Sequence, residues 1–145
     1  MARLNYAKIS PEGYKKLGDV LAVVAASGID MGLLHMIYLR VSQINNCPYY
    51  VDLHWRDATK SGIDARKLNA LTVWRDTPFF SDQENAALEW AEMVTYMEDQ
   101  DSLENAFTYA KKFFSEKQLV ELTFGIAQMN AFNRIGIAFH SMPIE

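Results

Sequence analysis

Apolar residues recur along the chain with the spacing of helix faces, and the alternation typical of a half-buried strand is nearly absent. The clearest case lies between residues 31 and 46, where the apolar positions are Leu33, Leu34, Ile37, Val41 and Ile44. Steps of three and four residues return a side chain to the same face of an α-helix. The pattern predicts an all-α protein of about seven helices, without a sheet, an internal repeat or a low-complexity linker.

Capping residues divide this pattern into separate helices. Serine and aspartate accept hydrogen bonds from the first free amides of a helix, proline fits its first turn, and glycine permits the left-handed turn that ends it. Ser10-Pro11 and Gly28 bound the first predicted helix, and Cys47-Pro48 and Gly62 bound the third. The predicted ranges are 11–28, 31–46, 48–60, 65–75, one helix from residue 82, one from the cap signature Asp101–Glu104, and a last helix over 116–140.

The last predicted helix is apolar on nearly all sides. Such a helix lies in the centre of a protein or in a contact between subunits. Gly125 and Gly136 are eleven residues apart, about three helical turns, so they lie on one side of it. We expect another helix to approach closely along that side.

Length, charge and cysteine content narrow the class of protein. The 145 residues suit one domain over 1–145, and 14 basic against 18 acidic residues give a net charge of −4. This balance argues against binding to nucleic acid, which requires a basic surface. No apolar run reaches the roughly 20 residues needed to span a bilayer, and one cysteine cannot form an intrachain disulfide. We expect a cytoplasmic protein that binds neither nucleic acid nor membrane.

The most reactive side chains lie around the start of the third predicted helix. Cys47 stands at its N-terminus, where free amides and the helix dipole favour a thiolate. His54 follows seven residues later, about two turns on, and Tyr50 lies between them on the same face. A thiol, a phenol and an imidazole in one row can form a reactive site, although a lone cysteine is more often a small buried apolar residue.

This stretch also carries a resemblance to a known family. Residues 39–54, LRVSQINNCPYYVDLH, are similar to the core motif of alkylhydroperoxidase D (AhpD)-like proteins, in which a Leu-Arg-Val-Ser-Gln-Ile-Asn segment precedes Cys-x-x-Cys-x-x-x-His. Further similarity occurs at 56–58, 74–81 and 130–134. The chain thus resembles the alkylhydroperoxidase D / carboxymuconolactone decarboxylase superfamily over most of residues 33–139.

The resemblance implies an all-α fold that assembles as a homotrimer or homohexamer, and an antioxidant activity. Active members reduce hydroperoxides with the cysteine pair, and the cysteine nearer the histidine attacks the peroxide. The histidine and an upstream glutamate form a proton relay that generates the thiolate. The second sulfur resolves the sulfenic acid, and a dithiol such as dihydrolipoamide supplies electrons.

Two of the four working groups of that family are changed here. Cys47 matches the resolving cysteine and His54 matches the histidine, but Tyr50 occupies the position of the attacking cysteine and His35 that of the glutamate. A phenol with a pKa near 10 cannot replace a thiolate toward peroxide. The usual dithiol cycle is therefore predicted to be weak or absent, and any catalysis is expected to use Cys47 and His54, with Tyr50 and His35 shaping the site.

Other conspicuous residues have structural interpretations. His35, His54 and Cys47 could form part of a zinc or copper site, but the spacing suggests no acidic or fourth ligand, so no metal and no cofactor is predicted. Arg40 and Arg56 are expected to pair with acids such as Asp52 or Asp57 rather than to bind an anion; Asp52 and Arg56 have the favourable four-residue spacing.

Three functions remain open at this stage. The chain could be a peroxidase-like protein with weak one-cysteine activity at Cys47 or none. It could be a lyase of the decarboxylase type with His54 as general acid or base and His35 or Tyr50 as its partner. It could also be an oligomeric small-molecule-binding protein without catalysis. A shared fold does not decide among these reactions.

Overall fold

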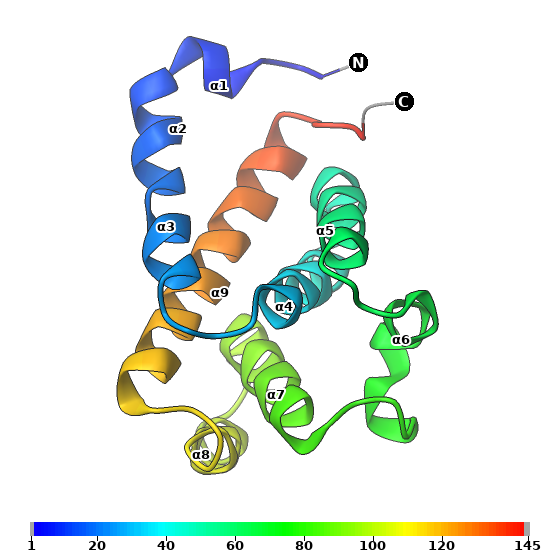
Figure 1. Ribbon diagram of the computed structural model, residues 1–145. Coiled ribbons are helices and arrows are strands. Elements are labelled where there is room, and N and C mark those ends of the chain that lie inside the picture. The colour runs from blue at the N-terminus through cyan, green and yellow to red at the C-terminus, as the bar shows by residue number, and fades with distance from the viewer. Residues whose placement is uncertain (1, 144–145) are drawn as a thin grey trace.

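The computed structural model describes residues 2–143, and every regular element within them is a helix (Figure 1). The described part holds nine α-helices, six of them at least eight residues long, and one 3₁₀ helix, and no strand. The helices are α1 (Tyr6–Ile9), α2 (Pro11–Gly18), α3 (Val20–Ala25), α4 (Met31–Ile44), α5 (Pro48–Lys60), α6 (Ala65–Asn69), η1 (Leu71–Asp76), α7 (Asp82–Tyr96), α8 (Gln100–Ala110) and α9 (Glu116–Ala138). The predicted all-α class is confirmed.

The number of helices exceeds the predicted seven because two predicted helices are divided. The helix predicted over 11–28 breaks at Asp19, directly after Gly18, where two weak helix formers are adjacent. The helix predicted over 65–75 changes into the 3₁₀ segment η1, within which Val73 has a non-helical φ of −123°. A further short helix, α1, is capped by Asn5, whose side chain accepts a hydrogen bond from the Lys8 amide.

Most predicted helix ends agree with the structure. Gly28 and Gly62 have φ angles of +81° and +87°, as expected for residues that end a helix. Ser81 and Ser115 form capping boxes with Glu84 and Gln118. The predicted cap at Asp101 is wrong: Asp99 accepts the hydrogen bond from the Ser102 amide, so α8 begins earlier.

Helix α4 lies at the centre of the bundle. It packs against α5, α7 and α9, and the long α9 also lies along α3 (Figure 1). Nine of the fourteen residues of α4 are buried, which agrees with its nearly continuous apolar sequence. The helix therefore holds its buried side chains between three neighbours.

The glycine side of α9 receives residues from α4 and α5, as the sequence predicted. A Cβ atom at Gly125 would lie 2.8 Å from the hydroxyl oxygen of Tyr38, and one at Gly136 would lie 3.2 Å from the Sγ of Cys47. Glycine at these positions therefore lets two residues of the candidate site pack against the helix backbone.

Other apolar residues of α9 face outward. Val120 and Phe124 are 54% and 57% exposed, and the expected homotrimer or homohexamer stays a prediction. No helix within residues 2–143 combines the length and apolar character needed to cross a membrane.

Candidate functional site

Helices α4 and α5 carry the predicted site residues. The two helices are joined by a tight turn in which Asn46 has a φ of +54° and the Cys47 amide donates a hydrogen bond to the Ser42 carbonyl. Cys47 is the N-cap residue of α5, as predicted, and Tyr50 and His54 follow at intervals close to one helical turn. His35 faces them from the first half of α4.

Three of the four predicted residues lie in one row of rings. The ring centroids of His35 and His54 are 5.8 Å apart, and those of Tyr50 and His54 are 5.9 Å apart, with interplanar angles of 28° and 20°. Tyr38 covers another side of His54 at 5.2 Å, and Phe132 of α9 packs on Tyr50 at 5.7 Å. His54 is thus enclosed by aromatic rings, and Tyr38 is a site residue that sequence reasoning missed.

His54 is deeply buried and has no polar partner. It is 5% exposed, and neither ring nitrogen forms a hydrogen bond within residues 2–143. Burial, aided by the neighbouring His35, lowers the pKa of His54 to about 3. The imidazole is therefore neutral at neutral pH, with one nitrogen carrying a proton and the other a free lone pair.

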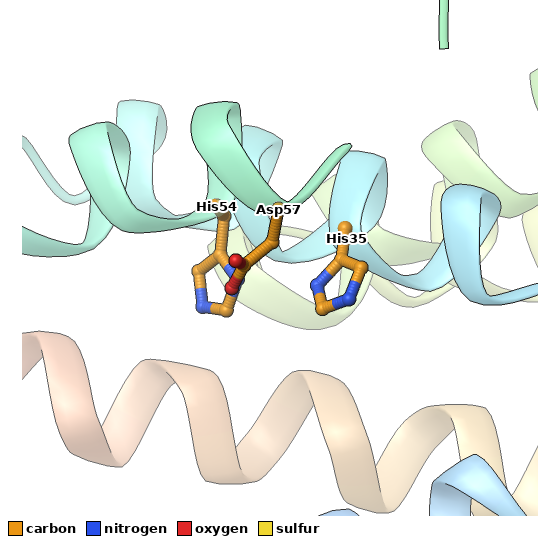
Figure 2. Close-up of side chains that lie close together, drawn as sticks. All are labelled: His35, His54 and Asp57. Carbon is orange, nitrogen blue, oxygen red and sulfur yellow. The ribbon is translucent and has the colours of Figure 1, made fainter. Parts of the chain in front are cut away.

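His35 is partly exposed and lies close to an acid. Burial lowers the pKa of His35, while the negative charge of Asp57 opposes this shift. One ligand atom from each of His35, His54 and Asp57 can be chosen so that all three lie within 4.8 Å of one another. Figure 2 shows the three side chains extending to the same side of α4 and α5.

The acidic partners of the histidines and arginines differ from the sequence analysis in two ways, the first of which concerns Asp57. It stands three residues after His54, on the same face of α5, and so supplies the acidic group that the spacing was judged not to suggest. Arg40, which was expected to pair with Asp52 or Asp57, instead donates to Glu92 at 2.7 Å. The other predicted pair, Arg56 with Asp52, is confirmed at 2.9 Å.

Cys47 is sealed within the protein. Its side chain is fully buried, and burial raises the pKa of the thiol, although the amides of Tyr50 and Tyr49 and the side chain of Asn133 act in the opposite direction. The helix N-terminus was expected to favour a thiolate; that expectation is wrong here because loss of solvation outweighs the amide groups. At neutral pH the sulfur is a protonated thiol.

Tyr50 fills the space between Cys47 and His54. It is 6% exposed, and burial raises the pKa of its phenol above the usual value. The phenol is therefore neutral and can act only as a hydrogen-bond donor or acceptor, not as a nucleophile at neutral pH.

A buried amide network supports the Cys47 side of the site. The Asn133 side chain, 0% exposed, donates to Ser42 Oγ at 3.0 Å and accepts from Asn45 Nδ2 at 3.0 Å. Asn45 also donates to Asn130 Oδ1 at 2.9 Å. Both Asn130 and Asn133 belong to the late segment that resembles the family, so the resemblance could have marked them although no chemistry did.

A separate hollow of about 430 Å³ lies elsewhere, between α7, α8 and α9. Its lining is largely apolar and includes Trp90, Phe107 and Leu119. Its titratable side chains are Lys111 and Glu116, and it brings no histidine, cysteine or tyrosine together. The row around His54 is the better candidate for a reactive site.

Comparison with known proteins agrees with this geometry. Residues 11–93 match the model of the carboxymuconolactone decarboxylase family, and this range includes His35, Cys47, Tyr50, His54 and Asp57. The chain belongs to that family.

Two relatives of this family member share much of its sequence. The uncharacterized protein YdfG of Bacillus subtilis is 34% identical over 136 residues, covering 94% of this chain and 92% of YdfG. The uncharacterized protein YnjA of Escherichia coli is 32% identical over 114 residues, covering 77% of this chain and 61% of YnjA.

Solved structures show the same fold. A protein of unknown function from Agrobacterium tumefaciens, suggested to be an antioxidant defence protein AhpD, superposes over 100% of both chains with a TM-score of 0.92 and 35% identity. The debrominase Bmp8, solved as a variant in complex with 2,3,4-tribromopyrrole, is 21% identical with a TM-score of 0.82, covering 94% of this chain and 73% of its own. The chain is thus an AhpD-like member of the family.

Proposed function

We propose that this family member is an alkylhydroperoxidase D-type protein of the antioxidant class whose dithiol peroxidase reaction is weak or absent. The observation that carries the proposal is the ring of Tyr50, stacked on His54 at 5.9 Å where the family places its attacking sulfur. The one cysteine of the sequence, Cys47, is fully buried.

The proposal follows from the balance of the peroxidase reaction. A thiolate attacks one peroxide oxygen, the S–O bond forms as the O–O bond breaks, and the alcohol leaves after taking a proton. The resulting sulfenic acid condenses with a second thiol, releasing water and forming a disulfide that an external dithiol reduces. Here the attacking thiolate is lacking, and the other sulfur is a protonated, buried thiol.

His35 adds a second obstacle. The family relay uses a carboxylate to hold the histidine in the state that removes the proton from sulfur. His35 has no negative charge, and its stacking on His54 at 5.8 Å helps to keep His54 unprotonated. The carboxylate that lies near the two imidazoles, that of Asp57, belongs to α5 rather than to α4.

Hydroperoxide turnover with a dithiol reductant tests the proposal. We expect a rate near background for the wild type, a clear increase for Tyr50→Cys, and loss of that increase in Tyr50→Cys/Cys47→Ser. Cysteine at position 50 would stand three residues after Cys47 and one turn before His54, the arrangement that the dithiol reaction requires. Adding His35→Glu to Tyr50→Cys should raise the rate further.

Two results would overturn the proposal. Turnover in the wild type that disappears in Cys47→Ser would establish a one-cysteine peroxidase. An inert Tyr50→Cys/His35→Glu variant that remains folded by circular dichroism would show that the site is not of the peroxidase type.

A second candidate function is acid–base catalysis of the decarboxylase type. The observation that favours it is the pair of neighbouring imidazoles: His54 has two ring nitrogens without partners, and the Nδ1 of His35 is also unpartnered within residues 2–143. A neutral imidazole can remove or deliver a proton. Lactone turnover that is unchanged in Cys47→Ser and lost in His54→Gln would support this function over the first.

A further inference from the structure

We propose that His35, His54 and Asp57 bind one divalent transition-metal ion, zinc or a neighbour of similar ligand preference. The three side chains bring two imidazoles and one carboxylate together between α4 and α5 (Figure 2), and one ligand atom of each lies within 4.8 Å of the others. The proposal does not depend on peroxidase or lyase activity.

The first support is the unsatisfied state of His54. Buried polar atoms almost always have a hydrogen-bond partner, because leaving one without a partner costs free energy. His54 is 5% exposed and both of its ring nitrogens lack a partner within residues 2–143. A bound cation would occupy the lone pair of one nitrogen, leaving the other as an N–H group.

The second support is the carboxylate. Within residues 2–143 Asp57 pairs with Lys60, whose Nζ lies 3.9 Å from Oδ1, and the Asp57 side chain is 30% exposed. A contact of this length between partly exposed groups contributes little. Asp57 is thus free to turn toward the two imidazoles, and its exposed side gives an ion a way in from solvent.

The spacing suits a metal after a small closure. Zinc bonds to nitrogen and carboxylate oxygen are about 2.0–2.2 Å long, so two ligands of one ion stand roughly 3–4 Å apart. The ligand atoms, within 4.8 Å of one another, exceed this spacing by roughly 1–2 Å at most, a change that side-chain rotation of His35 and Asp57 can supply. Both residues lie at intermediate exposure, so neither is fixed by close packing on every side.

The ligand set selects the kind of metal. Two imidazoles with one carboxylate are typical of zinc and of iron, cobalt or nickel in the divalent state, whereas magnesium and calcium prefer oxygen ligands alone. The sulfur of Cys47 is outside the cluster, which argues against a thiolate-rich site. Three protein ligands leave a coordination position for water or substrate, as in catalytic zinc sites.

The site is tested by measuring Zn²⁺ binding to the full chain by titration calorimetry, after a chelator has removed any bound metal. We expect one ion per chain in the wild type and binding at least about tenfold weaker in Asp57→Asn and in His35→Gln. Bound Co²⁺ should give a visible absorption spectrum that indicates a low coordination number, and this spectrum should be lost in the same variants. Since both changes are at partly exposed positions, the variants are expected to fold.

Matched controls separate this site from other causes. Asp52→Asn removes a different carboxylate from the same helix and should leave Zn²⁺ affinity unchanged, as should Cys47→Ser. The proposal is overturned if the wild type does not bind Zn²⁺, or if Asp57→Asn and His35→Gln bind it as tightly as the wild type. Loss of binding in Cys47→Ser would also overturn it, because the sulfur would then be a ligand.

Discussion

Glu92 and His54 are buried to a similar extent, at 3% and 5% exposed, but their polar atoms have opposite surroundings. Glu92 of α7 accepts hydrogen bonds from Arg40 Nε at 2.7 Å, from Trp74 Nε1 at 2.9 Å and from Arg75. His54 has no hydrogen bond within residues 2–143. One buried group is therefore saturated by protein donors, and the other is surrounded by rings.

The difference separates a structural centre from a candidate reactive one. Burial alone would raise the pKa of Glu92, but hydrogen bonds from Arg75, Trp74 and Arg40 outweigh it and lower the pKa, so the carboxylate stays charged. At His54 nothing counteracts burial, and the imidazole stays neutral. A saturated group has no capacity left for a ligand, whereas unpartnered nitrogens can bind a proton, a substrate or a metal.

The largest expected effect comes from breaking the saturated centre. Glu92→Gln removes the negative charge that Arg40 and Arg75 share, and the side chain of Arg40 is only 13% exposed. Removing one member of a buried ion pair is strongly destabilising, so we expect a loss of about 3 kcal/mol in the free energy of unfolding. Urea denaturation measures it.

Glu89→Gln is the control for that loss. Glu89 also faces Arg75, but at 3.9 Å and with a side chain 35% exposed. Its loss should cost less than about 1 kcal/mol. Equal effects of the two substitutions would show that saturation of Glu92 does not distinguish this centre.

An intermediate effect is expected from acid on the unsaturated centre. His54 has a pKa of about 3 in the folded chain against 6.5 in the unfolded one. Between these values the unfolded chain binds more protons than the folded chain. The stability that the neutral His54 contributes to the folded protein is therefore fully present above pH 6.5 and is lost as the pH decreases. At pH 5 the loss attributable to His54 is about 2 kcal/mol.

His54→Leu isolates that contribution from carboxylates that titrate in the same range. In a chelator, the difference in free energy of unfolding between His54→Leu and the wild type should grow steadily from pH 7 to pH 5. Because leucine removes unpartnered polar atoms, the variant should be at least as stable as the wild type at pH 7. A difference independent of pH would mean that His54 is not neutral and buried.

Sequence reasoning reached the fold more completely than the site. Helical spacing and caps such as Ser81 and Ser115 depend on neighbouring residues, so they can be predicted from one stretch of the sequence. The stripe of Cys47, Tyr50 and His54 followed from their spacing on α5 for the same reason. The glycine at position 136 predicted that another part of the chain packs closely against α9, but it did not predict that Cys47 is the residue in contact.

What sequence reasoning missed depends on pairing between helices. The burial of Cys47 and His54 is produced by α4 and α9 packing on α5. This burial lowers the pKa of His54, and it raises the pKa of the Cys47 thiol against the local influence of the helix N-terminus. Arg40 meets Glu92 fifty-two residues away. Asp57 was different: its spacing from His54 was visible in the sequence, but the carboxylate was assigned to an arginine.

The smallest expected effect concerns that other acid of α5. Asp52 and Arg56 form an exposed pair four residues apart, with an Nη2–Oδ2 distance of 2.9 Å. Asp52→Asn should therefore change the free energy of unfolding by no more than about 0.5 kcal/mol. Asp57→Asn, without zinc, should have a similarly small effect on the free energy of unfolding because the contact of Asp57 with Lys60 is loose.

Thermal denaturation with and without Zn²⁺ then sharpens the comparison: the ion should raise the midpoint for Asp52→Asn as it does for the wild type, but not for Asp57→Asn. An equal rise in both variants would make Asp57 an ordinary surface acid and leave the unpartnered nitrogens of His54 without their proposed ligand.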